Sequence, residues 1–164
     1  MQDCTFRIFT DSGCDISPAL LAEWGVRLEA LTFRFNDSKK EYTNEDMAPR
    51  EFYEKMRNGG IAKTAAVNSE SFASAFEDAL KQGLDVLYVG FSSGISNTYN
   101  AARIAAEELR AKYPERKIFV IDTLTASAGE GLLVWPSRNA NRGGPEAKKV
   151  GKSSTQWPAI THAK

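Results

Sequence analysis

The stretch from residue 85 to residue 98, Asp-Val-Leu-Tyr-Val-Gly-Phe-Ser-Ser-Gly-Ile-Ser-Asn-Thr, constrains the fold more than any other part of the chain. Its apolar run, Val86 to Phe91, has the length and the β-branched and aromatic content of a strand that is buried on both faces. A polar loop follows, and Tyr99 to Lys112 then has the Ala, Glu and Arg content of a helix. A buried strand that leads through a polar loop into a helix is typical of an open α/β sheet.

The loop after this strand is a candidate binding site. It consists mostly of hydroxyl, amide and glycine residues, namely Ser92, Ser93, Gly94, Ser96, Asn97 and Thr98. The unpaired N–H groups and the positive dipole end at the start of the next helix attract a phosphate or a carboxylate, and hydroxyl groups can add hydrogen bonds. A second interpretation is that Ser96 or Asn97 only caps the helix. The local pattern does not decide between them.

Two other predicted strands end in polar residues of the same kind. Thr5 to Thr10 is followed by Asp11-Ser12, and Lys117 to Ile121 is followed by Asp122-Thr123. Because the carboxyl ends of parallel strands lie along one edge of a sheet, the three loops are expected on the same rim. The chain is therefore predicted to be an α/β protein with an open, mostly parallel sheet and helices on both faces.

The spacing of apolar residues and the helix-end signals predict the other elements. A long strand is expected at Val26 to Phe35, with a bulge near Ala30, and Ile61 to Val67 is an ambiguous extended segment. Helices are expected at Ala19–Trp24, Pro49–Asn58, Glu70–Gln82 and Tyr99–Lys112. A last helix begins near Thr125 and is expected to end at Pro136, because a proline ring clashes with the preceding turn.

The charge of the chain is unevenly divided. The 164 residues carry no formal net charge, but Pro136 to Lys164 has six Lys or Arg residues and one acidic residue, which leaves this section at +5 and the rest at −5. We predict one domain at residues 1–135 and a disordered or non-homologous basic tail at 136–164. The acidic domain argues against a nucleic-acid partner, although the tail alone is open to a second interpretation as an arm that binds nucleic acid or an acidic partner.

Composition also predicts the compartment. No apolar run is long enough to cross a bilayer, and the N-terminus lacks the basic and apolar regions of a signal peptide, so we expect no membrane insertion and a cytoplasmic location. Cys4 and Cys14 are expected to be reduced thiols without a metal. Cys14 has no His or Lys partner nearby in the sequence, and His162 in the basic section is expected to be solvated rather than a general base.

Six short motifs follow one another along the chain. They are Thr10-Asp11-Ser12, Glu51 to Met56, Lys63-Thr64, Ser92 to Tyr99, Ile121 to Thr123, and Ala126 to Gly129. In this order and at these spacings, over nearly all of residues 6 to 135, they resemble the DegV family of bacterial fatty-acid-binding proteins. The resemblance implies the EDD fold and a two-domain protein that binds one long-chain fatty acid. In characterised members the bound carboxylate is presented to a fatty acid kinase, which makes the acyl phosphate.

The resemblance also implies which residues bind the carboxylate head group. Thr64 and Ser93 are expected to make the main contacts, and the further ligand-binding residues are Ser92, Gly94, Ser96 and Ser12. The bound fatty acid is a ligand, and no catalytic residue, metal or other cofactor is implied.

The sequence departs from the family pattern in two respects. The Ser-Gln-Pro that follows the family's Thr is Ala65-Ala66-Val67 here, so one hydroxyl is missing. The resemblance also fades at Trp135, before the second domain that covers the acyl chain. We therefore hypothesise a truncated or out-of-frame copy, and expect residues 1–164 to bind a fatty acid weakly or not at all.

A function of a different class is the alternative prediction. In this interpretation the chain is an α/β enzyme that acts on a phosphorylated small metabolite, with Ser92 to Thr98 around the phosphate and Asp11 or Asp122 as a base or metal ligand. Aspartates at strand ends are more often structural caps than catalytic groups, which favours the binding function.

Overall fold

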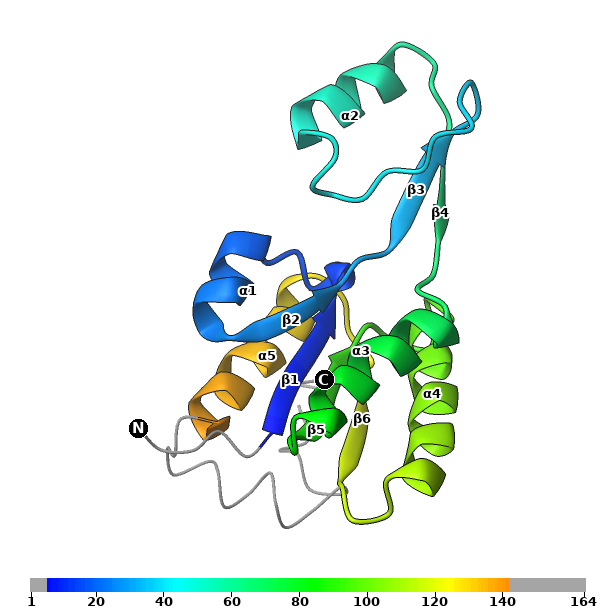
Figure 1. Ribbon diagram of the computed structural model, residues 1–164. Helices are drawn as coiled ribbons and strands as arrows, with labels where there is room; N and C mark the ends of the chain where they lie inside the picture. Colours follow the sequence, from blue (N-terminus) through cyan, green and yellow to red (C-terminus); the bar gives the residue numbers. More distant parts are fainter. Residues whose placement is uncertain (1–5, 142–164) are drawn as a thin grey trace.

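The computed structural model describes residues 6–141, with side chains as far as residue 137. Within this range the centre of the molecule is a four-stranded parallel sheet in the order β2-β1-β5-β6 (Figure 1). The strands are β1 (Phe6–Asp11), β2 (Val26–Glu29), β5 (Asp85–Gly90) and β6 (Ile118–Asp122). Each neighbouring pair is parallel, which confirms the predicted sheet type.

Helices cover both faces of this sheet. On one face Val86 and Tyr88 of β5 lie in a core with residues of α3 (Ser69–Lys81) and α4 (Thr98–Lys112). On the other face Leu87 and Val89 lie in a core with residues of α1 (Pro18–Trp24) and α5 (Ala128–Asn141). Successive residues of a strand point to opposite faces, so an unbroken apolar run is what a strand covered on both sides requires. The predicted architecture is confirmed.

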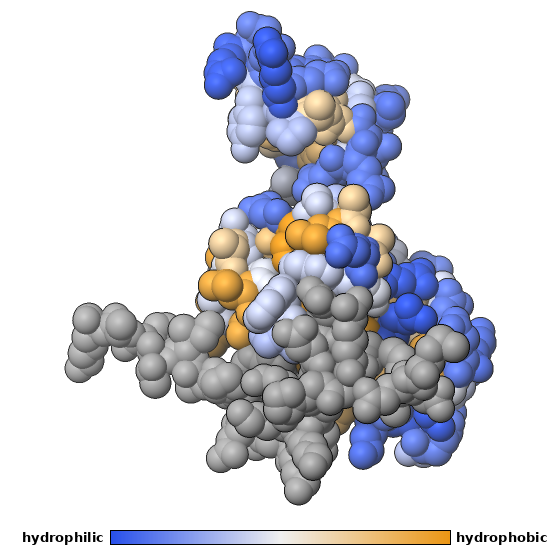
Figure 2. All heavy atoms as spheres, turned by 90° about the vertical axis from the view of Figure 1, so that its left-hand side faces the viewer, coloured by the Kyte–Doolittle hydropathy of each residue, from blue (hydrophilic) through white to orange (hydrophobic). Residues whose placement is uncertain are grey.

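A second, smaller sheet stands apart from the first. It pairs β3 (Thr32–Phe35) with β4 (Ala62–Ala65) in antiparallel register, and α2 (Pro49–Arg57) lies between them in sequence. Figure 1 shows the three elements projecting beyond the carboxyl ends of the large sheet. This unit has its own core, in which Phe33, Phe35 and Met47 are buried. Its outer surface is mostly hydrophilic in Figure 2.

The small sheet corrects the prediction of one long strand at Val26 to Phe35. That segment is divided between two sheets, because the chain leaves the large sheet after β2 and pairs again only at β3. The hydroxyl of Ser12 accepts a hydrogen bond from the backbone N–H of Leu31 at 3.0 Å, which holds the chain at this crossover. The break was predicted as a bulge because apolar alternation continues through it. The ambiguous segment at Ile61 to Val67 contains β4.

The prediction that the last helix ends at Pro136 was wrong, since α5 continues to Asn141. Proline has no N–H, so the carbonyl of Leu132 lacks its helical hydrogen-bond donor. Leu132 lies on the exposed side of the helix, where water can donate to that carbonyl instead. Leu133 and Val134 are buried in the core, and the Ser137 hydroxyl donates to the Leu133 carbonyl at 2.8 Å. Packing therefore holds the helix through the proline.

The rest of the predicted basic tail lies outside the described residues, so its disorder and the boundary at residue 135 stay predictions. Across residues 6–141, the longest helices are too short or too polar to span a bilayer.

Candidate functional site

The loops after β1 and β5 are joined by the carboxylate of Asp11. This side chain is fully buried. One of its oxygens accepts a hydrogen bond from the Gly13 N–H at 2.9 Å, and the other accepts from the Phe91 N–H at 2.9 Å and from the Tyr88 hydroxyl. Burial raises the pKa of Asp11, and these hydrogen bonds oppose the rise. Because its oxygens are engaged by three donors, Asp11 fits the structural role better than that of a base or a metal ligand.

A second carboxylate joins the loops after β5 and β6. One oxygen of Asp122 accepts hydrogen bonds from the backbone N–H groups of Ser93, at 3.2 Å, and Leu124, at 3.1 Å. The Ser92 N–H donates to the carbonyl of Thr125 at 3.0 Å. The three strand-end loops predicted on one rim are therefore linked to one another in the structure.

The hydroxyl groups of the β5–α4 loop differ in their availability. Ser92 is buried, and its hydroxyl accepts from the Gly94 N–H at 3.2 Å. The Ser96 hydroxyl lies 2.9 Å from that of Thr98 and also accepts from the Thr98 N–H. Ser93 is exposed, and its hydroxyl has no hydrogen-bond partner within the described part of the chain. Of the predicted loop residues, Ser93 is the one whose hydroxyl is free to meet a ligand.

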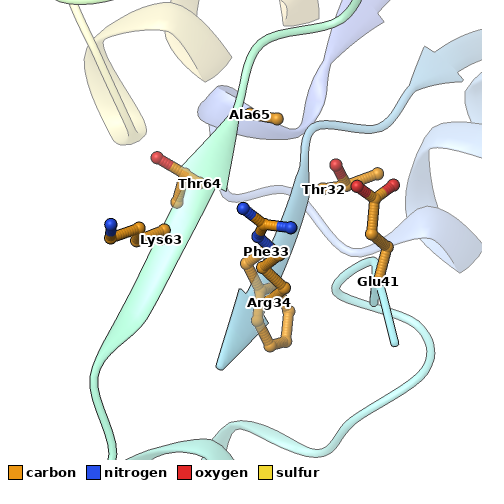
Figure 3. Close-up of a pocket in the computed structure, with 7 residues that line it drawn as sticks. All are labelled: Thr32, Phe33, Arg34, Glu41, Lys63, Thr64 and Ala65. Atoms are coloured by element: carbon orange, nitrogen blue, oxygen red, sulfur yellow. The ribbon is translucent and has the colours of Figure 1, made fainter. Parts of the chain in front are cut away.

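Ser12 and Thr64 lie in different surroundings. The Ser12 hydroxyl is occupied by the Leu31 N–H, so its role in this structure is to position the crossover to the small sheet. Thr64 is exposed on β4, opposite Phe33 of β3. It lines a cavity of about 320 Å³ on the small sheet (Figure 3), and the other lining residues are Thr32, Phe33, Arg34, Glu41, Lys63 and Ala65.

The cavity at Thr64 is lined from the small sheet and the segment at Glu41, without a residue of the β5–α4 loop among the lining residues described above. The structure therefore brings Ser92, Ser93, Gly94 and Ser96 together on the rim of the large sheet, and places Thr64 in a cavity of the small one. That Thr64 and Ser93 contact the same head group stays a prediction.

The family of the chain follows from comparison with known proteins. A family model described as "Uncharacterised protein, DegV family" matches residues 5–163. The chain belongs to the DegV family. A DegV domain-containing protein of Clostridium perfringens is 36% identical over 146 residues, which are 88% of this chain and 50% of that protein. One of Lactococcus lactis is 33% identical over 131 residues, 79% of this chain and 45% of that protein.

Solved DegV structures share the fold. A DegV family protein of Thermus thermophilus, described for its fatty acid binding, superposes with a TM-score of 0.77 and 28% identity, over 89% of this chain and 50% of that one. A stearic acid-binding protein of Eubacterium ventriosum gives 0.78 and 27%, over 89% of this chain and 51% of that one. The chain thus spans about half the length of these DegV relatives.

The sequence did not predict a buried acid that lies beside the rim formed by the strand-end loops. Glu130 of α5 is fully buried, and one of its oxygens lies 2.9 Å from the Thr10 hydroxyl. Burial, and then the nearby Asp11, raise the pKa of Glu130 to about 9, so it is protonated at neutral pH. The Thr10 hydroxyl also lies 3.0 Å from the Val89 carbonyl. The Thr10 hydroxyl has a single proton, which it donates to the Val89 carbonyl. Its oxygen can then accept a hydrogen bond from the protonated carboxyl group of Glu130. An acid two residues before the apolar run of Leu132, Leu133 and Val134 was the available signal.

The one thiol among the described residues has surroundings that fit a structural role. Cys14 is buried, and burial raises the pKa of its thiol to about 11, so it is a poor nucleophile at neutral pH. Residues 6–137 contain no group of three His, Cys, Asp or Glu side chains that could hold a metal ion. Cys4 and His162 lie outside the described residues.

Proposed function

We propose that this chain binds a long-chain fatty acid, with the carboxylate held by hydroxyl groups that include Ser93 and Thr64. The observation that carries the proposal is the similarity, over 89% of the chain, to DegV proteins described for binding fatty acids and stearic acid. Two features of Ser93 support the proposal. Its hydroxyl is exposed, and its backbone N–H is held by a hydrogen bond to the Asp122 carboxylate. Hydroxyl donors of this kind suit a carboxylate, which accepts hydrogen bonds only.

The acyl tail and the carboxylate head group contribute differently to the free energy of binding. Burial of an acyl tail contributes about 0.8 kcal/mol per methylene, whereas a hydrogen bond to a charged group contributes about 1.5 to 3 kcal/mol. The tail therefore sets most of the affinity, and the hydroxyls set the orientation of the head group. Because residues 1–164 correspond to about half of the related proteins, we expect this chain alone to bind more weakly than a relative of full length.

Isothermal titration of the 164-residue chain with palmitate and oleate tests the proposal. We expect saturable one-to-one binding that is weakened about tenfold by Ser93→Ala or Thr64→Ala, the loss of one hydrogen bond to a charged group. Ser74→Ala is the matched control, because Ser74 is an exposed serine on α3 and is not one of the predicted ligand-binding residues. Binding that is absent, or equal in all four proteins, would remove the support for this site.

The proposal extends to a partner. The bound carboxylate would be presented to a fatty acid kinase, in a cytoplasmic location where ATP is available. This step is tested by adding a bacterial fatty acid kinase and ATP to the loaded chain and measuring acyl phosphate. Formation that does not depend on the chain would contradict the partnership while leaving fatty acid binding intact.

A further inference from the structure

Leu124, in the loop after β6, combines a strained backbone with an exposed apolar side chain. Its φ is 53°, in the left-handed region, and its side chain is 70% exposed. Among the described residues, the other non-glycine residues with a positive φ are Asp15 and Ser127, which have short polar side chains. A left-handed leucine costs conformational free energy. The exposed side chain gains no burial in the described core that would offset this cost.

The backbone of Leu124 is held close to that of Ser93. One oxygen of Asp122 accepts hydrogen bonds from the N–H groups of both residues, at 3.1 Å from Leu124 and 3.2 Å from Ser93. A second hydrogen bond joins the same two loops, from the Ser92 N–H to the Thr125 carbonyl at 3.0 Å. Leu124 is therefore fixed on the rim as a neighbour of the hydroxyl that is free to meet a ligand.

A second exposed aliphatic side chain lies in the loop of Ser93. Ile95, two positions further along, is 68% exposed. Both loops lie at the carboxyl ends of the large sheet, from which the small unit with Thr64 projects (Figure 1). Single apolar side chains on a surface are common and need no explanation. Here apolar surface and a free hydroxyl occur together, which suits a ligand with a polar head next to methylene groups.

We infer that the side chain of Leu124 contacts the methylenes next to the carboxylate of a bound fatty acid, while Ser93 contacts the carboxylate itself. This inference rests on the proposed function and adds an apolar subsite to it. Strained residues cluster at functional sites, and burial of the leucine side chain against a ligand gives this one a function. A competing explanation is that Leu124 packs against a further polypeptide segment, since the chain spans about half the length of its relatives.

The variant Leu124→Gly separates binding from folding. Glycine adopts the left-handed backbone without strain, so the folded variant should be at least as stable as the unchanged chain. Leu124→Ala removes the apolar contact but keeps a Cβ, so it controls for the greater backbone freedom of glycine. The matched control is Leu132→Ala, because Leu132 is a leucine of the same exposure, 70%, on the outer side of α5.

Isothermal titration with dodecanoate and palmitate measures binding by each protein. We expect both Leu124 variants to bind both acids about tenfold more weakly, the factor expected when the burial of one leucine side chain is lost. The factor should be the same for the two acids, because they share the methylenes next to the carboxylate and differ only at the far end of the tail. Leu132→Ala should bind both acids as the unchanged chain does.

Four results would overturn the inference: unaltered binding by the Leu124 variants, a loss seen only in Leu124→Gly, a loss confined to palmitate, or an equal loss in Leu132→Ala. The proposed function stands in each of these cases if the unchanged chain binds and Ser93→Ala weakens both acids. Failure of both acids to bind the unchanged chain would overturn the proposed function and this inference together.

Discussion

The buried Glu130 makes folding stability depend on pH in a defined direction. Its pKa is about 9 in the folded chain, against an ordinary value of 4.5. Between these values the unfolded chain releases the proton and the folded chain keeps it, so the free energy of unfolding falls as the pH rises. The slope is at most about 1.4 kcal/mol per pH unit. From about pH 5.5 to about pH 7.5 this residue alone can lower stability by as much as about 2.7 kcal/mol.

The variant Glu130→Gln isolates this effect. Glutamine has the shape of the protonated acid and can donate to the Thr10 hydroxyl, but it does not titrate in this range. Asp11, whose pKa burial also raises, is present in both proteins, so its contribution largely cancels in the difference between them. We expect the unchanged chain to lose stability relative to Glu130→Gln as the pH rises, so that the variant is the more stable protein near neutrality.

Urea denaturation followed by circular dichroism at several pH values measures the difference. Glu108→Gln is the control, because Glu108 is an exposed acid on α4 without an ion pair among the described residues. Its stability curve should run parallel to that of the unchanged chain. A parallel curve for Glu130→Gln as well, or a gain in relative stability of the unchanged chain with rising pH, would refute the assignment of a buried neutral acid.

Three further predictions concern the strand-end loops. Asp11→Asn should lower the free energy of unfolding by about 1 to 3 kcal/mol in urea denaturation, because an amide cannot accept from the donors on both sides of the carboxylate. Leu124→Gly should raise the stability by about 0.5 kcal/mol in the same assay, since Leu124 has a φ of 53° and a side chain that is 70% exposed, and glycine adopts that backbone without strain. Cys14 should react with a thiol reagent only as fast as the chain opens, which timed mass spectrometry measures; rapid reaction in the folded protein would contradict its burial.

Local sequence patterns were sufficient to predict the large sheet. They were not sufficient to predict where the chain leaves that sheet or where the last helix ends. The run from Val86 to Val89 predicts a strand because a strand that is buried on both faces has apolar residues at consecutive positions. The division of Val26 to Phe35 was not predictable in this way. It depends on a hydrogen bond between Ser12 and Leu31, which are 19 positions apart. The continuation of α5 through Pro136 depends on burial of Leu133 and Val134 against other elements, which the sequence of the helix does not display.

The candidate site shows the same limit. The polar residues from Ser92 to Thr98 were recognisable from their order, but which hydroxyl is free was decided by contacts within the loop.

The two carboxylates at the strand ends also determine how the rim can respond to a ligand. Asp11 joins the loop after β1 to the loop after β5, and Asp122 joins the loop after β5 to the loop after β6. Three segments that are distant in sequence are thereby held in one fixed arrangement. The entropy of ordering these loops is lost during folding, so a ligand that contacts Ser93 does not have to order them at binding.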